Sequence, residues 1–168
     1  MTIKAHKARA PRFLKIAVVS VSTTRSLADD KSGQWITKRA KKKGHDVVSH
    51  QVVPDSQERI AEAISKVMEE SFPHAILVTG GTGISPKDVT IEAIRPMFTK
   101  ELTAFGTLFT SLSYEDINTA ALLSRATAGL IDRTIVFCMP GSLKACKLAC
   151  NELIFPEMGH MVKHALYG

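Results

Sequence analysis

The sequence of 168 residues is 45% hydrophobic and 23% charged, which excludes an intrinsically disordered chain and suits one domain with a sizeable core. No apolar run approaches the roughly 18 residues that a membrane span needs, and the start of the chain lacks the apolar segment of a signal peptide, so we expect a cytoplasmic protein with no membrane partner. Five of the six net positive charges lie within residues 1–15, so the rest of the chain is nearly neutral and we expect no nucleic-acid partner.

A basic leader precedes the predicted domain. Residues 1–13 contain no acidic residue, and this composition is typical of a flexible, solvated chain end. Residues 14–168 show no internal repeat, low-complexity stretch or linker. We therefore expect them to form a single α/β domain.

Four segments rich in branched aliphatic residues are predicted to be strands: residues 14–21, 46–53, 75–79 and 134–139. Three of them are nearly continuous apolar runs, as in strands that are covered on both faces. The spacing of apolar residues predicts helices over residues 33–43 and 56–70, and Asp55 with Glu58 would form a capping box at the start of the second. This alternation predicts a three-layer, doubly wound, mostly parallel sheet with helices on both faces.

Small, hydroxyl-bearing and acidic residues follow the predicted strands. In doubly wound folds ligands bind beyond the carboxyl ends of the strands, so these loops should form one site. The residues are Ser20 and Ser22 after the first strand, Asp55 after the second, residues 79–88 after the third, and Pro140, Gly141 and Ser142 after the last. Residues 98–127 are predicted to form helical turns that cover this rim.

The segment Thr79-Gly80-Gly81-Thr82-Gly83 is a candidate anion site, because glycines between a strand and a helix expose backbone N–H groups to a ligand. It lacks the Gly-Lys-Ser/Thr ending of a P-loop, and Pro86 stands where a dinucleotide fingerprint needs its third glycine. On its own, the segment could equally be a plain tight turn.

Two aspartates lie in loops beside this segment. Asp88 could be the N-cap of a helix over residues 89–97, as Asp55 could be for the earlier helix. Two carboxylates beside a phosphate-binding loop are also what a magnesium–nucleotide site requires. We therefore take Asp55 and Asp88 as candidate catalytic residues and Mg²⁺ ligands, with Lys87 or Lys144 as a source of further positive charge.

Other candidates have simpler structural explanations. The turn from Met139 to Ser142 could bind an anion, with Ser142 as a helix N-cap, or could only connect a strand to a helix. Trp35 and Phe105 are expected in the core rather than on a ligand ring. Reduced, buried thiols are expected at Cys138, Cys146 and Cys150. His160 and His164 share a helix face, but no third metal ligand accompanies them.

Six short motifs follow one another along the chain: Val53-Pro54-Asp55, Thr79-Gly80-Gly81-Thr82-Gly83, Asp88-Val89-Thr90, Leu112-Ser113-Tyr114-Glu115, Leu123-Ser124-Arg125 and Met139-Pro140-Gly141-Ser142. In this order they resemble the MoaB/Mog family of molybdenum-cofactor biosynthesis proteins, from about residue 16 to the C-terminal helix. The stretch Ser-Tyr-Glu-Asp-Ile and the turn Met-Pro-Gly-Ser are more similar to the MoaB branch than to the Mog branch.

The resemblance implies a molybdopterin-binding domain that assembles as a trimer or hexamer and adenylylates molybdopterin with magnesium ATP. It implies that Asp55 and Asp88 are the catalytic, metal-associated pair, and their retention favours an active enzyme because some MoaB-branch proteins lack them. A molybdenum insertase would be a partner. The nucleotide- or phosphate-binding residues would be Thr79, Gly80, Gly81, Thr82 and Gly83, and the molybdopterin-binding residues Ser20, Ser22, Ser113, Ser124, Pro140, Gly141 and Ser142.

One stretch departs from the family's pattern. Where relatives usually have Pro-Gly-Phe-Gly-Glu, this chain has Thr103-Ala104-Phe105-Gly106-Thr107. The changes at Ala104 and Thr107 alter the local loop and remove one acidic contact, so substrate binding could differ here.

The predicted reaction is attack by the terminal phosphate of molybdopterin on the α-phosphorus of ATP, with release of pyrophosphate. Two other functions remain open. A non-catalytic molybdopterin-binding carrier or partner protein would make no use of the aspartates. An adapter would dock its basic leader on an acidic partner.

Overall fold

The computed structural model describes residues 10–167, in which six strands form one mixed sheet in the order β2-β1-β3-β6-β5-β4. Four strands are mutually parallel: β1 (Lys15–Val21), β2 (Asp46–Val53), β3 (Ala75–Thr79) and β6 (Thr134–Met139). The edge is antiparallel, because β5 (Thr127–Ile131) runs against β6 and β4 (Lys100–Glu101) runs against β5. The predicted α/β sheet is confirmed, and the antiparallel edge is an addition that the sequence pattern did not indicate.

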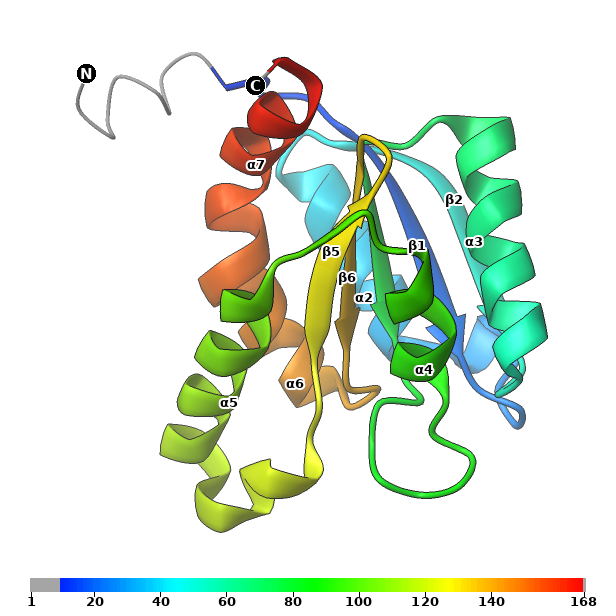
Figure 1. Ribbon diagram of the computed structural model, residues 1–168, viewed down its shortest axis with the longest axis vertical. Helices are drawn as coiled ribbons and strands as arrows, with labels where there is room; N and C mark the ends of the chain where they lie inside the picture. The colour runs from blue at the N-terminus through cyan, green and yellow to red at the C-terminus, as the bar shows by residue number, and fades with distance from the viewer. Residues whose placement is uncertain (1–9, 168) are drawn as a thin grey trace.

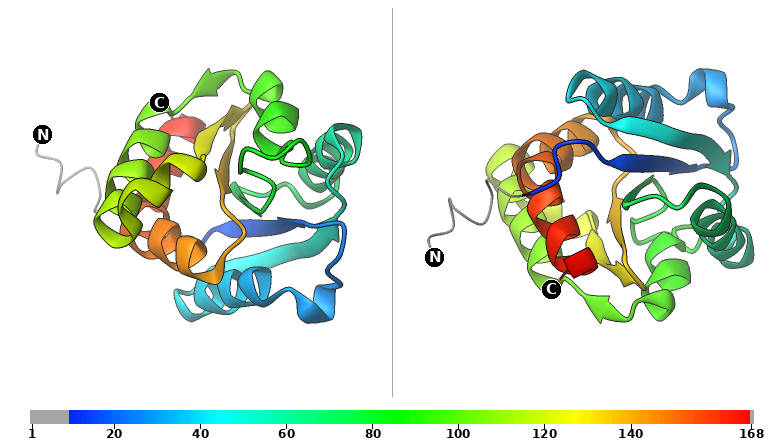
Figure 2. Two further views of the ribbon diagram at one scale, coloured as in Figure 1. Left: turned by 90° about the horizontal axis from the view of Figure 1, so that it is seen from below. Right: turned by 90° about the horizontal axis from the view of Figure 1, so that it is seen from above.

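Helices cover both faces of the sheet (Figures 1 and 2). One face carries α2 (Lys31–Lys42), α5 (Thr103–Ile117), α6 (Leu143–Leu148) and α7 (Phe155–Tyr167), the last two joined by a π-helical turn, η4 (Ala149–Ile154). The other face carries α3 (Gln57–Ser71) and α4 (Thr90–Ile94). Short 3-10 turns lie in the connections: η1 (Leu27–Asp29), η2 (Arg95–Met97) and η3 (Asn118–Leu123).

Residues of the central strands alternate between two hydrophobic cores. In β1, Ile16 and Val18 pack towards α2 and α5, whereas Ala17 and Val19 pack towards α3 and α4. All four side chains are fully buried. This burial on both faces explains the continuous apolar runs from which the strands were predicted.

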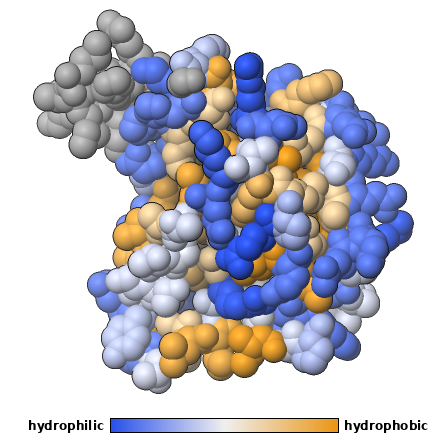
Figure 3. Space-filling view, viewed as in Figure 1, coloured by the Kyte–Doolittle hydropathy of each residue, from blue (hydrophilic) through white to orange (hydrophobic). Residues whose placement is uncertain are grey.

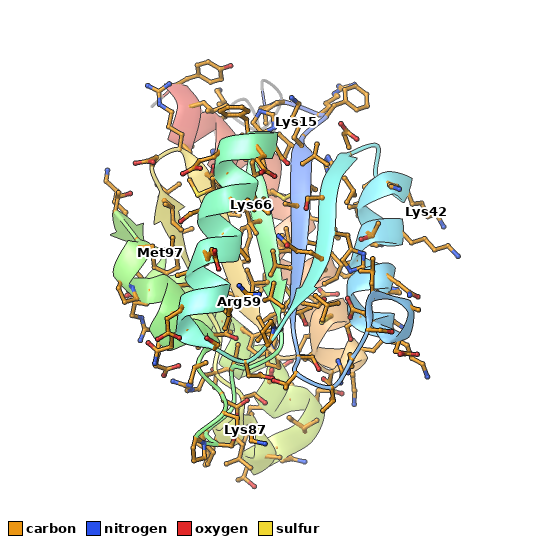
Figure 4. All side chains as sticks on the ribbon, turned by 90° about the vertical axis from the view of Figure 1, so that its right-hand side faces the viewer. Lys15, Lys42, Arg59, Lys66, Lys87 and Met97 are labelled. Carbon is orange, nitrogen blue, oxygen red and sulfur yellow. The ribbon has the colours of Figure 1, made fainter. Side chains whose placement is uncertain are left out.

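The register of the sheet brings the strand ends to one rim. Val21 pairs with Val53, Ser20 with Thr79, and Thr79 with Met139. The loops that follow these strands therefore lie together, at the lower end in Figure 1. Figure 4 shows the two ends of the molecule, with Lys15 at the start of β1 and Lys87 in a loop at the rim.

The prediction of helical turns over the rim by residues 98–127 is wrong for most of that segment. After β4, the helix α5 packs on the face of the sheet, with Phe105 and Phe109 in the core. Only η3 and the residues before β5 reach the rim, where Leu123 and Ser124 line a cavity. The large aromatic residues of α5 explain the difference, because burying them against the sheet removes more apolar surface from water than a rim position would.

The capping box predicted at Asp55 is also wrong by one residue. Ser56 is the N-cap of α3, and its Oγ accepts a hydrogen bond from the amide of Arg59. The carboxylate of Asp55 therefore does not cap α3 and is available for other contacts.

The predicted basic leader, residues 1–13, lies for the most part outside the described residues. From Ala10 to Tyr167, no helix combines the length and the apolar character needed to cross a membrane.

Candidate functional site

Loops beyond the strand ends enclose a polar cavity of about 220 Å³. Leu123, Val21 and the exposed Arg25 line it although they were not predicted. Ten of the fourteen predicted site residues also line it: Ser22, Asp55, Gly80, Gly81, Thr82, Gly83, Asp88, Ser124, Pro140 and Gly141. A wider groove of about 590 Å³ lies near Phe72 and Arg133, but it contains none of the predicted residues, so we take the smaller cavity as the site.

The other four predicted residues lie outside this cavity. Ser20 is buried and its Oγ donates to Asp30 Oδ2 at 2.5 Å, while Thr79 Oγ1 donates to the carbonyl of Pro140 at 3.1 Å. Ser113 is buried on α5. Ser142 is the N-cap of α6, as predicted, because its Oγ accepts from the amide of Ala145.

The conformation of the glycine loop requires glycine at two positions. Gly80 and Gly81 have φ angles of 98° and 64°, in the left-handed region that L side chains rarely adopt. A Cβ on Gly80 would lie 2.4 Å from the carbonyl oxygen of Val21, and a Cβ on Gly81 would lie 2.4 Å from Thr90 Oγ1. The loop therefore passes closer to its neighbours than any other residue allows.

Every carbonyl from Gly80 to Gly83 accepts a hydrogen bond. Gly80 O accepts from Thr90 Oγ1 at 2.8 Å, and Gly81 O accepts from Thr90 N at 2.9 Å. Thr82 O and Gly83 O both accept from Arg125 Nε, each at 3.0 Å. The carbonyls of the loop are thus all paired within the protein.

The amides of the same loop are open. Within residues 10–167, the N–H groups of residues 81–84 donate to no protein acceptor. Thr82 Oγ1 is buried and also has no partner among these residues. Successive unpaired N–H groups in a concave loop attract an anion, so this loop has the chemistry of a phosphate cradle.

Two carboxylates flank the cradle, and each is fixed through one oxygen. Asp55 Oδ2 accepts from Thr23 N and Thr23 Oγ1 at 2.8 and 2.7 Å, and Asp88 Oδ2 accepts from Ser85 N at 2.9 Å. In the part of the chain described, no donor binds either Oδ1. Asp55 Oδ1 lies 3.4 Å from the position of a Cβ on Gly81, and Asp88 Oδ2 lies 2.8 Å from that of a Cβ on Gly83.

This arrangement corrects the prediction that Asp88 caps a helix over residues 89–97. Helix α4 begins at Thr90, its N-cap is Val89, and no side chain caps it. The Asp88 carboxylate instead turns back to the amide of Ser85, three residues earlier. That contact holds it beside the glycine loop.

The donor set suits Mg²⁺ only with substrate oxygens added. Two carboxylates and nearby hydroxyls are hard oxygen ligands, and protein-bound Mg²⁺ commonly uses one or two carboxylates together with phosphate oxygens. No cluster of three or more His, Cys, Asp or Glu ligands occurs within residues 10–167, so nothing there builds a complete metal cage.

Neither of the two lysines predicted to add positive charge, Lys87 and Lys144, lines the cavity. Lys144 forms an ion pair with Asp116 at 2.9 Å and does not line the cavity. Lys87 is exposed at the rim (Figure 4). Arg25 provides the cation on the cavity wall, in a short polar loop whose sequence gave no periodic or motif signal.

The remaining candidates behave as structural residues. Phe105 packs in the core against Phe137, and Trp35 packs at the edge of the same core. All three cysteines are buried and free, and burial raises the pKa of their thiols. His160 and His164 contact each other through their Nε2 atoms at 3.1 Å on α7.

Comparison with known proteins gives the same family as the sequence motifs. A family model described as "Probable molybdopterin binding domain" matches residues 16–160. The chain is 44% identical to molybdenum cofactor biosynthesis protein B of Bacillus subtilis over 97% of this chain and 96% of that protein. It is also 44% identical to the protein of the same name from Staphylococcus aureus, over 90% and 91% of the two chains.

Solved structures agree. A crystal structure of a molybdenum cofactor biosynthesis protein B superposes with a TM-score of 0.89 and 43% identity, over 94% of this chain and 98% of that chain. The tungsten cofactor synthesizing protein MoaB from Pyrococcus furiosus superposes with a TM-score of 0.85 and 39% identity, over 93% and 99% of the two chains. The chain therefore belongs to the MoaB/Mog family of molybdenum cofactor biosynthesis proteins.

Proposed function

We propose that this protein is a molybdopterin adenylyltransferase, which transfers AMP from magnesium ATP to the terminal phosphate of molybdopterin and releases pyrophosphate. Membership of the family supports the pathway and the pterin substrate. The observation that carries the proposed reaction is the placement of Asp55 and Asp88, whose carboxylates flank the open amides of residues 81–84 in one cavity.

The chemistry requires two anionic phosphates to meet. An oxygen of the molybdopterin phosphate forms a bond to the α-phosphorus of ATP, while the bond from that phosphorus to the β-phosphate oxygen breaks and pyrophosphate leaves. No nucleophile from the protein is needed. The protein's task is to position the phosphates and to offset their charge.

The described residues can divide this task between them. The amides of residues 81–84 would donate to phosphate oxygens, and Arg25 would add positive charge on the cavity wall. Asp55 and Asp88 would hold Mg²⁺ through the oxygens that no protein group binds, and the ion would supply positive charge between the phosphates. Ser124, Pro140 and Gly141, on another wall, would contact the molybdopterin side.

Exposed apolar side chains line or adjoin the cavity loops, which suits flat rings. Figure 3 shows apolar surface gathered along the lower end of the molecule, where the cavity loops lie. Leu122 and Leu123 of η3 are 78% and 56% exposed, and Ile84 of the glycine-loop segment is 68% exposed. Such side chains would cover the faces of a pterin or adenine ring.

The test is a magnesium-dependent assay of pyrophosphate release with molybdopterin and ATP. We expect the purified chain to turn over and Asp88→Ala to lose at least about a hundredfold in rate, because removal of one group that stabilises transferring charge costs roughly that much. Asp46→Ala is the matched control, since Asp46 is exposed at the start of β2, away from the cavity. If the wild-type chain binds molybdopterin but forms no adenylylated product with Mg–ATP, the carrier function replaces the enzyme.

We further propose that the protein assembles as a trimer or a pair of trimers and delivers its product to a molybdenum insertase, as the family resemblance implies. Sedimentation of the purified chain tests the assembly. A mass equal to one protomer would contradict it.

A further inference from the structure

We propose that Arg125 is a positioning residue that holds the glycine loop in its anion-binding conformation and does not itself contact the phosphate. The inference deepens the proposed function at one point, since it requires that the loop binds phosphate. Its evidence is the set of contacts that the guanidinium makes.

The guanidinium of Arg125 connects two segments of chain to the loop. Its Nε donates to the carbonyls of Thr82 and Gly83, and its Nη2 reaches the carbonyl of Asp88 at 3.4 Å. Both Nη atoms also bind the carboxylate of Glu92 on α4, Nη1 to Oε1 and Nη2 to Oε2. Arg125 therefore clamps the loop against the start of β5 and against α4.

These hydrogen bonds to the carbonyls also fix the direction of the neighbouring N–H groups, because of the geometry of the peptide bond. In a trans peptide the C=O and the following N–H point to opposite sides of the chain. Because Arg125 fixes the carbonyls of Thr82 and Gly83 on its own side, the N–H groups of Gly83 and Ile84 face the opposite side. These two amides belong to the set that has no acceptor within the described residues.

A direct role on the phosphate does not fit the same contacts. A phosphate-binding arginine presents its planar fork to the ligand, whereas the fork of Arg125 faces Glu92. Ser124 lines the cavity, but the next residue, Arg125, does not. The hydrogen bond from Arg125 lowers the pKa of Glu92, so the pair remains charged and closed at neutral pH.

Arginine is also the one basic residue that can make this clamp. Its five N–H donors lie in a rigid plane, so Nε can serve the carbonyls while the two Nη atoms serve a carboxylate. A lysine at this position keeps the charge but has a single nitrogen. Lysine substitution therefore separates geometry from charge.

The experiment is a titration of the ¹⁵N-labelled full chain with inorganic phosphate, followed by the amide signals of Gly81, Gly83 and Ile84. We expect Arg125→Lys to weaken phosphate binding at these amides about tenfold, the effect of losing one charge-assisted hydrogen bond. Glu92→Gln should also weaken binding, because it releases the guanidinium from its anchor. The matched control is Arg95→Lys, since Arg95 pairs with Glu101 and makes no contact with the loop.

A direct phosphate role predicts the opposite sign for Glu92→Gln. Freeing a positive charge beside the ligand would tighten binding, and that result would overturn the proposal, as would Arg125→Lys within twofold of wild type. Absence of any phosphate response in the wild-type loop would overturn it as well. If Arg125→Lys does not fold, Glu92→Gln still decides between the two signs.

The same samples keep this inference distinct from the proposed function. If the wild-type loop binds phosphate, and if Arg125→Lys and Glu92→Gln both weaken that binding, the clamp is supported even when the AMP-transfer assay shows no product. Where turnover is measurable, a positioning role should change the KM for ATP and kcat together, and Arg95→Lys should change neither.

Discussion

The hydroxyl of Thr90 donates to the carbonyl of Gly80 at 2.8 Å, while the backbone amide of the same residue donates to the carbonyl of Gly81 at 2.9 Å. Thr90 is fully buried and is the first residue of α4. One residue therefore fixes two successive peptides of the glycine loop and ties them to the beginning of a helix.

Thr90→Val should lower the free energy of unfolding by about 1–3 kcal/mol, because it leaves the buried Gly80 carbonyl without its donor. Valine keeps the shape of the side chain, and the amide bond to Gly81 remains. Urea unfolding measures the change, and Thr90→Ser, which keeps the hydroxyl, should recover most of the stability. Equal stability of Thr90→Val and wild type would show that the hydroxyl contributes nothing to the loop.

Gly80→Ala and Gly83→Ala should separate folding from function. At Gly80 the φ of 98° and the 2.4 Å approach to Val21 O leave no room for a methyl group, so unfolding free energy should fall by roughly 2 kcal/mol or more. At Gly83 the atoms nearest to an added methyl group belong to the Asp88 carboxylate, the first of them at 2.8 Å. Gly83→Ala should therefore stay folded by urea titration but lose AMP transfer, and a fully active Gly83→Ala would argue against the assigned position of Asp88.

Asp30 should make the protein sensitive to acid. Burial of its carboxylate would raise its pKa, but hydrogen bonds from Ser20 Oγ, the Gly33 amide and His50 Nε2 outweigh this and lower the pKa below 3.8. A folded pKa below the unfolded one stabilises the protein above about pH 4, and this contribution disappears as pH falls through the folded value. Asp30→Asn should flatten the decline of unfolding free energy from about pH 5 downwards.

The control for this acid effect is Asp46→Asn, because Asp46 is exposed at the start of β2. Its unfolding free energy should follow the wild-type pH curve. An Asp30→Asn curve parallel to wild type would mean that other carboxylates, such as Glu92, account for the acid sensitivity.

The three thiols should not react in the native protein. Cys138, Cys146 and Cys150 are fully buried, and burial raises the pKa of each, so little thiolate forms at pH 8. A colorimetric thiol reagent should detect no reactive cysteine before denaturation and three afterwards. Rapid reaction of one thiol in the native state would indicate local opening of β6, α6 or η4.

The parts of the fold that follow from local pattern were predicted from the sequence. Continuous apolar runs identified β1, β3 and β6 because these strands are buried on both faces, whereas β2 lies at the edge of the sheet and is only partly buried along most of its length. The two antiparallel strands gave no such signal: β4 has two residues, and β5 contains Gly129, over which Phe98 packs so closely that a Cβ would lie 2.5 Å from its ring. Their pairing depends on tertiary contacts that no local pattern reports.

The candidate site, too, was predicted from the sequence only in part. Family motifs and strand-end loops located ten residues of the cavity, but the two aspartates were also interpreted as helix caps, and both caps are wrong. A carboxylate just before a helix pattern cannot reveal whether it turns to that helix or to its own loop. The role of Arg125 was equally hidden, because its partners Thr82 and Gly83 lie more than 40 residues earlier in the chain.

The reversed direction of β5 has a consequence for how the cavity is built. Thr127 pairs with Cys138 and Ile131 with Thr134, and a two-residue turn with Asp132 at a φ of 52° joins the strands at the far end of the molecule. A slip of this hairpin by one residue would move Arg125 by about 3.4 Å, which exceeds the tolerance of a hydrogen bond. The tight turn thus fixes the register of the hairpin, and the length of β5 then sets the position at which the guanidinium of Arg125 meets the loop.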